Sequence, residues 1–281
     1  MTASSASTAS TSAFTSTPAG GERCAPRADC VADSAGAVTF TWVGSAADGE
    51  ALVLRRRGAG SGPDDTVRLP LIAGGDDRVH AVLSATVELA EGHWDAYLGD
   101  GTAVEAGIRD LRALIDRVPQ TGRVTVRLPH PTADGRLAVR SWERDPHAEA
   151  GDIAVEPGAF TVECVLYGAR NGGGASVEAR LGDRVHRFAA TGQGERFSFT
   201  VPYSALVEDP AAPVGKQQLW TLWLCPAAEA EGAAAVRISR LLDDVWDRKD
   251  VFVYPAHEAA GYRAAPCYTA ANDLCVQLTP A

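Results

Sequence analysis

Hydrophobic and polar residues alternate with a period of two in many short stretches of the chain. Residues 38–42 read Val-Thr-Phe-Thr-Trp, and residues 274–278 read Leu-Cys-Val-Gln-Leu. Alternation of this kind places the apolar side chains on one face of a strand. Turn-forming residues separate the stretches, as in Gly99–Gly101. Many short strands with frequent turns are typical of antiparallel β-sandwiches, so we predict an all-β fold.

Two segments have the apolar spacing of a helix instead. They are residues 108–118 and 238–245. We expect a short helix or turn there, at one end of each sandwich. The chain has neither the strand–helix–strand rhythm nor the glycine fingerprint of a doubly wound nucleotide-binding fold. A fold of that class is therefore not predicted.

Several blocks of sequence occur twice in the same order. The matched blocks are 94–98 with 220–224, 114–118 with 241–245, 124–126 with 251–253, and 129–139 with 266–276. Ordered self-similarity of this kind indicates a duplicated structural unit. We therefore predict two homologous antiparallel β-sandwich domains in tandem, residues 23–145 and 146–281, each with its own core. A linker is expected near residues 141–157, and an insertion in the second copy near residues 256–265.

Residues 1–22 are dominated by Ser, Thr and Ala, and Glu22 is their only charged residue. Such a segment buries too little apolar surface to offset its ordering entropy, so we predict a disordered N-terminal tail. It lacks the basic start and the apolar stretch of a secretory signal. The expected location of the protein is therefore cytoplasmic.

Charge and composition narrow the classes of partner. The 281-residue chain is 46% hydrophobic, as globular proteins are, and has a formal net charge of −10. An acidic balance argues against a nucleic-acid partner and against an anionic membrane surface, since both require clustered positive charge. No stretch approaches the roughly 18 uninterrupted apolar residues of a membrane span. We therefore predict neither nucleic-acid binding nor membrane insertion.

The sequence contains no recognisable catalytic or metal-binding motif. It has no C-x-x-C pair, no G-x-S-x-G elbow and no phosphate-binding glycine loop, and its six histidines are scattered. We therefore assign no catalytic residue, no metal and no cofactor. The six cysteines are Cys24, Cys30, Cys164, Cys225, Cys267 and Cys275. A sheet-bridging disulfide between Cys164 and Cys225 is conceivable, but the expected location favours reduced thiols.

Aromatic residues supply the candidate binding site. Trp142 and Trp246 adjoin charged loops, and with Tyr268 they are the leading ligand-binding candidates, because exposed aromatic rings stack on sugar faces. The alternative for these rings is that they cover the interface between the two domains.

The predicted insertion supplies three further candidates, which are His257, Tyr262 and Arg263. The two copies differ most in such segments. Loops of this kind build sites on an otherwise inert scaffold.

The repeated blocks also carry a family resemblance. The segments Trp94–Leu98, Leu241–Val245, Val251–Pro255 and Tyr268–Leu274 resemble the tandem accessory, immunoglobulin-like β-sandwich domains found beside actinobacterial glycosyltransferases and teichoic-acid-type glycerophosphotransferases. The arginine-rich composition, with Lys216 and Lys249 as the only lysines, also fits a high-GC actinobacterium. The resemblance implies a cell-surface-polymer or sugar context. The catalytic domain of those transferases has no counterpart here, so no catalytic residue is carried over.

Three functional hypotheses follow. The first is a non-catalytic accessory or binding protein that recognises a saccharide, a polymer or a partner glycosyltransferase. The second is a small biosynthetic enzyme, a transferase or cyclase, with its site between the two sandwiches. The third is a structural subunit whose N-terminal tail docks elsewhere.

Overall fold

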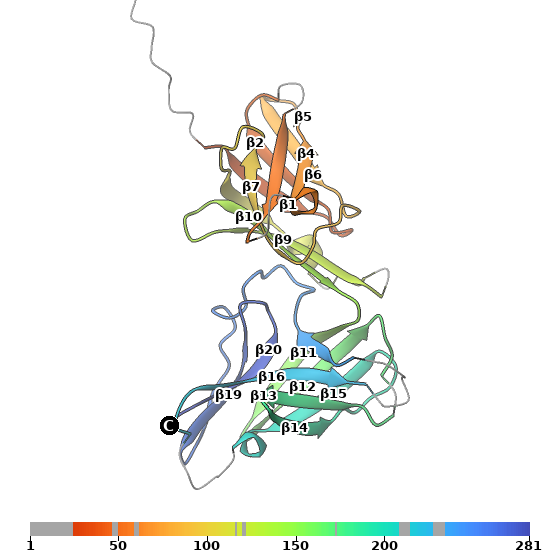
Figure 1. The fold of residues 1–281 in the computed structure, drawn as a ribbon, viewed down its shortest axis with the longest axis vertical. Helices are drawn as coiled ribbons and strands as arrows, with labels where there is room; N and C mark the ends of the chain where they lie inside the picture. The colour runs from red at the N-terminus through yellow and green to blue at the C-terminus, as the bar shows by residue number, and fades with distance from the viewer. Residues whose placement is uncertain are drawn as a thin grey trace, which may run out of the picture.

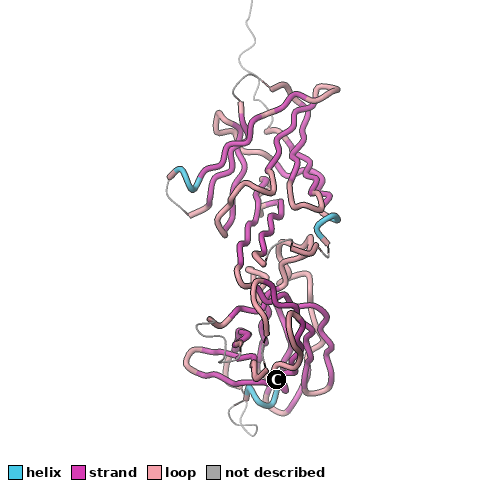
Figure 2. Tube along the Cα trace, turned by 90° about the vertical axis from the view of Figure 1, so that its right-hand side faces the viewer, coloured by secondary structure: helices cyan, strands magenta, loops and turns pink. Residues whose placement is uncertain are grey.

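The protein is almost entirely β-structure. The computed structural model describes residues 25–46, 50–58, 62–115, 117–119, 122–171, 173–207, 214–226 and 234–281. Within these ranges there are β-strands and three short 3₁₀ turns, and no α-helix. The strands form two lobes stacked along the long axis of the molecule (Figures 1 and 2). The all-β prediction is confirmed, whereas the predicted tail at residues 1–22 lies outside the described residues.

The N-terminal sandwich consists of two five-stranded sheets, with strand orders β5-β6-β2-β1-β8 and β4-β3-β7-β10-β9. The strands of the first sheet are β1 (Arg27–Ala32), β2 (Val38–Val43), β5 (Ile72–Ala73), β6 (Arg78–Leu83) and β8 (Glu105–Asp110). Those of the second sheet are β3 (Ala51–Arg56), β4 (Thr66–Pro70), β7 (Gly92–Leu98), β9 (Val124–Pro131) and β10 (Leu137–Arg144). The 3₁₀ turns of this half are η1 (Pro63–Asp65) and η2 (Arg112–Leu114).

The C-terminal sandwich repeats this arrangement with its two sheets joined. The pairing of β16 with β17 connects the path β15-β12-β11-β17-β16-β20-β19-β18, and β13 bridges β14 and β16. The strands are β11 (His147–Glu156), β12 (Ala159–Tyr167), β13 (Ser176–Leu181), β14 (Arg184–Ala189), β15 (Arg196–Pro202), β16 (Gln218–Cys225), β17 (Val236–Ser239), β18 (His257–Ala259), β19 (Tyr262–Tyr268) and β20 (Leu274–Thr279). The turn η3 spans Tyr203–Leu206.

The two sandwiches correspond in the pairing of residues between strands as well as in strand order. In the first, Trp94 lies opposite Val139 across β7 and β10. In the second, Trp220 lies opposite Val276 across β16 and β20. Both valines also face a proline in the next strand. The parallel pair β1–β8 likewise has its equivalent in β11–β17.

The hairpin turns after β9 and β19 have the same hydrogen-bonding pattern. The hydroxyls of Thr132 and Thr269 each accept the backbone N–H of the residue four positions on. Gly135 (φ 80°) and Asn272 (φ 61°) occupy the same left-handed position in the two turns. Asparagine and glycine tolerate this backbone conformation better than other residues do. This part of the repeat therefore reflects two turns of the same geometry.

One repeat block and the predicted linker are wrong. The valines at 124 and 126 are buried in β9, but Val251 and Val253 lie outside any strand and are 63% and 86% exposed. The strand that holds the position of β9 in the second sandwich is β19, so the extra residues of that sandwich precede Tyr262. The segment predicted as a linker, 141–157, lies mostly in β10 and β11. Its charged residues suggested an exposed linker, but most of them lie within these two strands.

The segments predicted as a short helix or turn begin as strand, because residues 108–110 end β8 and residues 238–239 end β17, and the rest forms short turns or bends. Residues 112–114 form η2, and residues 241–245 have no regular helix. Their apolar side chains are used for packing instead: Leu114, Leu241 and Leu242 all lie in the core of the N-terminal sandwich.

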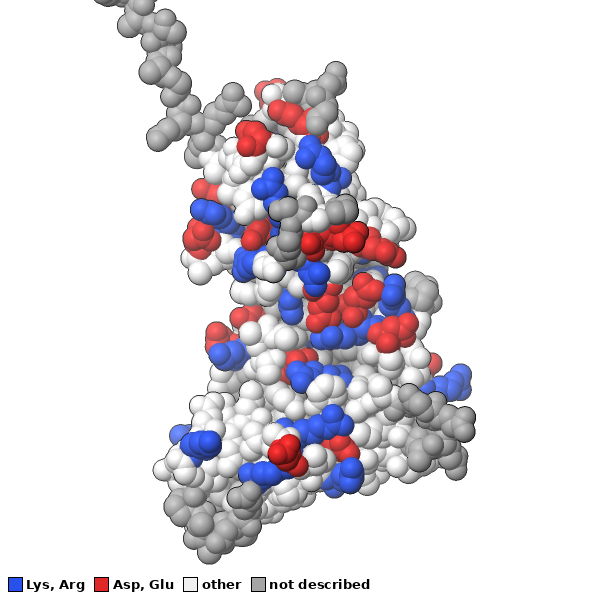
Figure 3. Space-filling model, in the orientation of Figure 1, with Lys and Arg blue, Asp and Glu red and all other residues white. Residues whose placement is uncertain are grey.

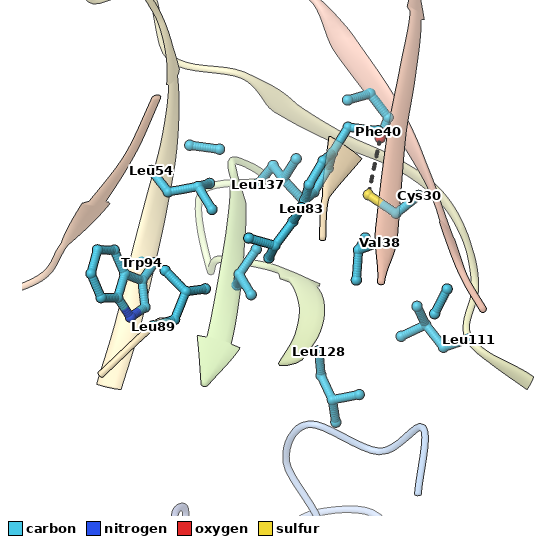
Figure 4. Close-up of a cluster of buried hydrophobic side chains, with 14 of the residues drawn as sticks. Cys30, Val38, Phe40, Leu54, Leu83, Leu89, Trp94, Leu111, Leu128 and Leu137 are labelled. Carbon is cyan, nitrogen blue, oxygen red and sulfur yellow. Dashed lines mark hydrogen bonds between the residues drawn. The ribbon is translucent and has the colours of Figure 1, made fainter. Parts of the chain in front are cut away.

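Each sandwich encloses a hydrophobic core. Figure 4 shows the first core, where Phe40, Leu83 and Leu137 extend between the two sheets. The second core is built around Trp220. The expectation that each half keeps a separate hydrophobic core is wrong at one point. Leu241 and Leu242 belong to the second half of the sequence but are buried in the first core. A domain boundary between residues 145 and 146 falls between β10 and β11 and stays a prediction.

Candidate functional site

The predicted ligand-binding tryptophans lie where the two sandwiches meet, a region we call the joint. Trp142 of β10 is fully buried, and its Nε1 donates a hydrogen bond to the carbonyl of Ala271 at 3.2 Å. Trp246 packs against the first core and stacks on His130 of β9, with ring centroids 4.2 Å apart. An exposed ring is wrong for Trp142, because the opposing half covers it, as in the alternative that these rings cover the interface between the two domains.

The backbones of the two halves come into close contact at the joint. Gly168, which follows β12, has φ 75°, and a Cβ placed on it would lie 2.9 Å from the carbonyl oxygen of Gly122 in the other half. Only glycine fits this position comfortably, since both the space and the backbone conformation exclude a side chain.

Tyr268 is also buried, as part of the second core. It lies on β19, whose even-numbered residues point inward, and its ring contacts Phe252 at a centroid distance of 6.3 Å. The expectation of an exposed ring is wrong here as well. The reason is strand register, because a one-residue shift moves a side chain to the other face of the sheet.

Residues 240–256, which we call the strap, run from the joint to β18 and are held by Arg248. This arginine is 0% exposed, and its Nη2 lies 2.5 Å from Oδ2 of Asp243. Its guanidinium also lies over the ring of Phe252, 4.6 Å from the centroid. The backbone N–H of Arg248 donates to Oδ1 of Asn272 at 3.0 Å. The bond to Asn272 fixes the strap relative to the second sandwich, and the contacts with Asp243 and Phe252 hold the strap to itself.

The carboxyl of Asp243 is held in its ionised form. Burial opposes ionisation, but a hydrogen bond from Asp244 and the charge of Arg248 outweigh it and lower the pKa of Asp243. Glu149 on β11 binds the strap beside this pair, because its carboxylate accepts the backbone N–H groups of Leu241 and Leu242 at 2.9 to 3.0 Å. Glu149 therefore anchors the start of the strap, and Asp243 ties that start to Arg248.

Beyond Arg248 the strap forms one wall of a hollow of about 360 Å³, which we call the groove. The other wall is the outer face of β19 and β20. The residues that line the groove are Lys249, Phe252, Val253, Tyr254, Ala256, Arg263, Ala264, Ala265, Pro266, Cys267, Gln277 and Thr279. This set combines two aromatic rings, two cations, an amide and a hydroxyl. No carboxylate or histidine is among these described lining residues.

Strand register explains the far wall of the groove. Arg263 lies opposite Thr279, and Ala265 lies opposite Gln277. These residues alternate with the inward side chains of β19, so the polar groups project away from the core. The small side chain at Ala265 leaves space beside the longer ones. On the strap side, Phe252 and Tyr254 are half-buried against the second core.

The other predicted residues lie at the end of β18 and β19. His257 accepts the backbone N–H of Gly158 through Nδ1 at 3.2 Å and stacks on Tyr203. Tyr262 is buried in the second core. Arg263 pairs with Glu258 at 3.2 Å and is the one predicted residue that lines the groove. A binding role for any of the six predicted residues stays a prediction.

The sequence reasoning missed Lys249, Tyr254 and Gln277 in the groove. Lys249 carried a usable signal, as one of only two lysines in the chain. Gln277 carried another, since alternation in its strand points it away from the core. Tyr254 gave no such signal, because the residues around it do not alternate regularly between apolar and polar side chains.

The thiols near the groove have the character of packing groups. Cys267 lies opposite Cys275 on β20, and both are free, as are Cys30, Cys164 and Cys225. The conceivable bridge between Cys164 and Cys225 is therefore not formed in this structure. Burial raises the pKa of Cys267 to about 11, although the Lys249 ammonium acts in the opposite direction. Such a thiol is a poor nucleophile at neutral pH.

At pH 8, Cys267 is expected to react with dithiobisnitrobenzoate about a hundredfold more slowly than an ordinary exposed thiol, because little thiolate forms. The measurement uses a Cys24→Ser background, since Cys24 lies outside the described residues. Guanidinium-unfolded protein is the control and should react at once with five thiols. A rapid burst from the native protein, lost in Cys267→Ala, would contradict the prediction.

Three further features of the described structure concern metal binding, membrane spans and surface charge. Among the described residues, no three His, Cys, Asp or Glu side chains gather as metal ligands. The same part of the chain contains no helix with the length and apolar character needed to cross a bilayer. Figure 3 shows basic and acidic side chains interleaved on the face in view, without a broad patch of one sign.

Comparison with known proteins identifies no family. No family model matches the chain, and no curated protein does. A crystal structure of S. aureus TarS, residues 217–571, aligns at a TM-score of 0.28 and 12% identity, covering 63% of this chain and 55% of that one. A maltotriose-bound pullulanase from Anoxybacillus sp. LM18-11 aligns at a TM-score of 0.25 and 10% identity, covering 70% and 24%. A marsupial T cell receptor aligns at 0.21 and 11%, covering 73% and 93%.

This chain thus spans about half of that TarS structure. The TM-scores of all three alignments are too low to carry an argument about fold or function.

Proposed function

We propose that this protein is a non-catalytic binding module that takes a saccharide into the groove. One observation carries the proposal: the half-buried ring of Tyr254 shares a hollow of about 360 Å³ with the amide of Gln277, the hydroxyl of Thr279 and two cations. A sugar presents an apolar C–H face and a rim of hydroxyls. An aromatic ring suits the face, and side-chain donors and acceptors suit the rim.

The size of the groove sets the extent of the ligand. Ligand pockets are typically about 300–1,000 Å³, so this groove lies near the lower end. It suits one end or a short segment of a polymer. The lack of carboxylate or histidine among the lining residues favours binding over acid–base chemistry, which needs such groups beside the substrate.

The tandem architecture supports an accessory role. The matched positions of Trp94 and Trp220 support duplication of one unit, and we infer that this unit is immunoglobulin-like. A glycosyltransferase is the partner that the sequence resemblance suggests. An actinobacterial source and a cytoplasmic location belong to the same proposal.

The enzyme alternative has one observation in its favour. A hollow of about 340 Å³ lies at the joint, between β8 and the strap, and contains Asp110, Asp244, Arg109 and Arg112. The hydrogen bond that its carboxyl donates to ionised Asp243, together with burial, raises the pKa of Asp244, as is seen for carboxyl groups that act as acids. Activity that is lost in Asp244→Asn and kept in Tyr254→Ala would favour this alternative over the groove.

Binding of an oligosaccharide is expected to weaken about tenfold or more in Tyr254→Ala, because the stacking surface is removed. The ligand is first sought on an array of oligosaccharides, and its affinity is then measured by calorimetry. Tyr97→Ala is the matched control, since Tyr97 is a half-buried tyrosine on the outer face of the first sandwich. Failure of every oligosaccharide to bind, or an equal loss in Tyr97→Ala, would contradict the proposal.

A further inference from the structure

The joint contains a buried histidine in an uncharged form. His130 is 2% exposed and lies between its own strand and the indole of Trp246, whose plane is tilted by 14° from the imidazole ring. Its Nδ1 lies 3.0 Å from the carbonyl oxygen of Pro131. A carbonyl only accepts, so Nδ1 carries the proton. Nε2 is buried without a hydrogen-bond partner in the described structure.

The groups that face the His130 ring do little to stabilise its protonated, charged form. His130 and the adjoining His93 have charged or titratable neighbours on every element around the pair. These neighbours are Arg57 after β3, His93 and Asp95 on β7, Arg109 on β8, Arg140 on β10, and Asp247 on the strap. The two carboxylates act through His93, whereas Arg57, Arg109 and His93 itself oppose charge on His130. Asp95 is in turn engaged by Arg57.

We propose that His130 makes the joint sensitive to acid: a proton on Nε2 displaces Trp246 and releases the strap from the first sandwich. The two sandwiches are then held as one body at neutral pH and are free to reorient in acid. The strap also forms one wall of the groove, so opening the joint alters that wall. The inference itself requires no ligand and stands independently of the proposed saccharide.

The direction of the pH dependence follows from linkage. Burial, with added repulsion from His93 and the nearby arginines, lowers the pKa of His130 to about 4 in the closed joint. A free histidine has a pKa of about 6.5, so the open state binds the proton more tightly. The closed joint is therefore fully favoured above about pH 6.5 and loses stability as pH falls toward 4. One proton changes the equilibrium up to tenfold per pH unit, or about a hundredfold across this window.

The test follows the ¹⁹F resonance of Trp246 in full-length protein labelled with 5-fluorotryptophan and assigned with Trp246→Phe. We expect the resonance to move toward the position of an exposed indole between pH 6.5 and 4. In His130→Phe, which keeps the stack but cannot gain charge, the resonance should stay in place. His186→Phe is the matched control, because His186 contacts Trp220 in the other sandwich, and its Trp246 resonance should respond as in the wild type.

Two results would overturn the inference: a Trp246 resonance that does not move from pH 7 to 4.5, or one that still titrates in His130→Phe. If the phenylalanine variant does not fold, His130→Gln supplies the same comparison with a neutral polar side chain. Loss of saccharide binding is not the readout, so a failed groove and a failed joint remain distinguishable.

Discussion

Replacement of Arg248 by methionine is expected to lower the free energy of unfolding by about 3–5 kcal/mol. The arginine is fully buried and pairs with Asp243. Removing Arg248 leaves the Asp243 carboxylate with the longer contact to Arg240, at 3.6 Å, as its remaining ion pair among the described residues, and losing one partner of a buried pair costs more than the pair itself contributes. Methionine fills similar volume, so the loss reports the charge more than a cavity. Urea unfolding followed by fluorescence and circular dichroism measures the effect.

A second substitution separates the charge from the packing. In Arg248→Met/Asp243→Asn the stranded carboxylate is gone, so part of the lost stability should return. Arg263→Met is the matched control at an exposed arginine and should change stability by about 0.5 kcal/mol or less. If the double variant is as unstable as the sum of its parts, the pair does not anchor the strap.

The β-architecture could be read from the sequence because its determinants are local. Alternation of apolar residues identifies strands without knowledge of their partners, and Trp94 and Trp220 lie at equivalent positions in the two sandwiches. The match between Thr132 and Thr269 was equally reliable, since a turn depends on a few adjacent residues. Paired valines at 251 and 253 misled because two residues cannot distinguish a strand from an irregular segment.

The joint could not be predicted in the same way. Trp142 is next to charged residues in the sequence, and only the opposing half shows that its ring is covered. Tyr268 depended on register, which alternation alone leaves ambiguous by one residue. Arg248 gave no sign of burial, because arginine is normally exposed and its partner arises from a bend in the strap.

The groove was only partly predictable for a related reason. Arg263 was found because it lies in a segment that differs between the copies. Lys249 and Tyr254 belong to the strap, whose path depends on the anchor at Arg248 and not on a repeating pattern. Sites formed between a strand and an irregular segment therefore require the tertiary structure.

The strap also gives the second half of the chain a direct role in the stability of the first. Leu241 is 1% exposed and lies in the core of the N-terminal sandwich, together with Leu114 and Leu128. Figure 4 shows a loop of the C-terminal half approaching Leu128. Leu241→Ala is therefore expected to destabilise the N-terminal sandwich by about 2–5 kcal/mol, the usual cost of a cavity in a packed core.

Hydrogen exchange locates this effect, because it reports stability strand by strand. Amides of β9 and β10 should lose protection in Leu241→Ala, whereas those of β12 and β15 in the other core should change less. Leu219→Ala is the matched control, since Leu219 is 39% exposed on β16 and should cost about 1 kcal/mol or less. Loss of protection confined to the C-terminal sandwich would show that Leu241 stabilises only its own half. Loss in β9 and β10 would instead mean that the N-terminal core is completed by a residue from beyond the predicted domain boundary, so that separately expressed halves should be less stable than the intact chain.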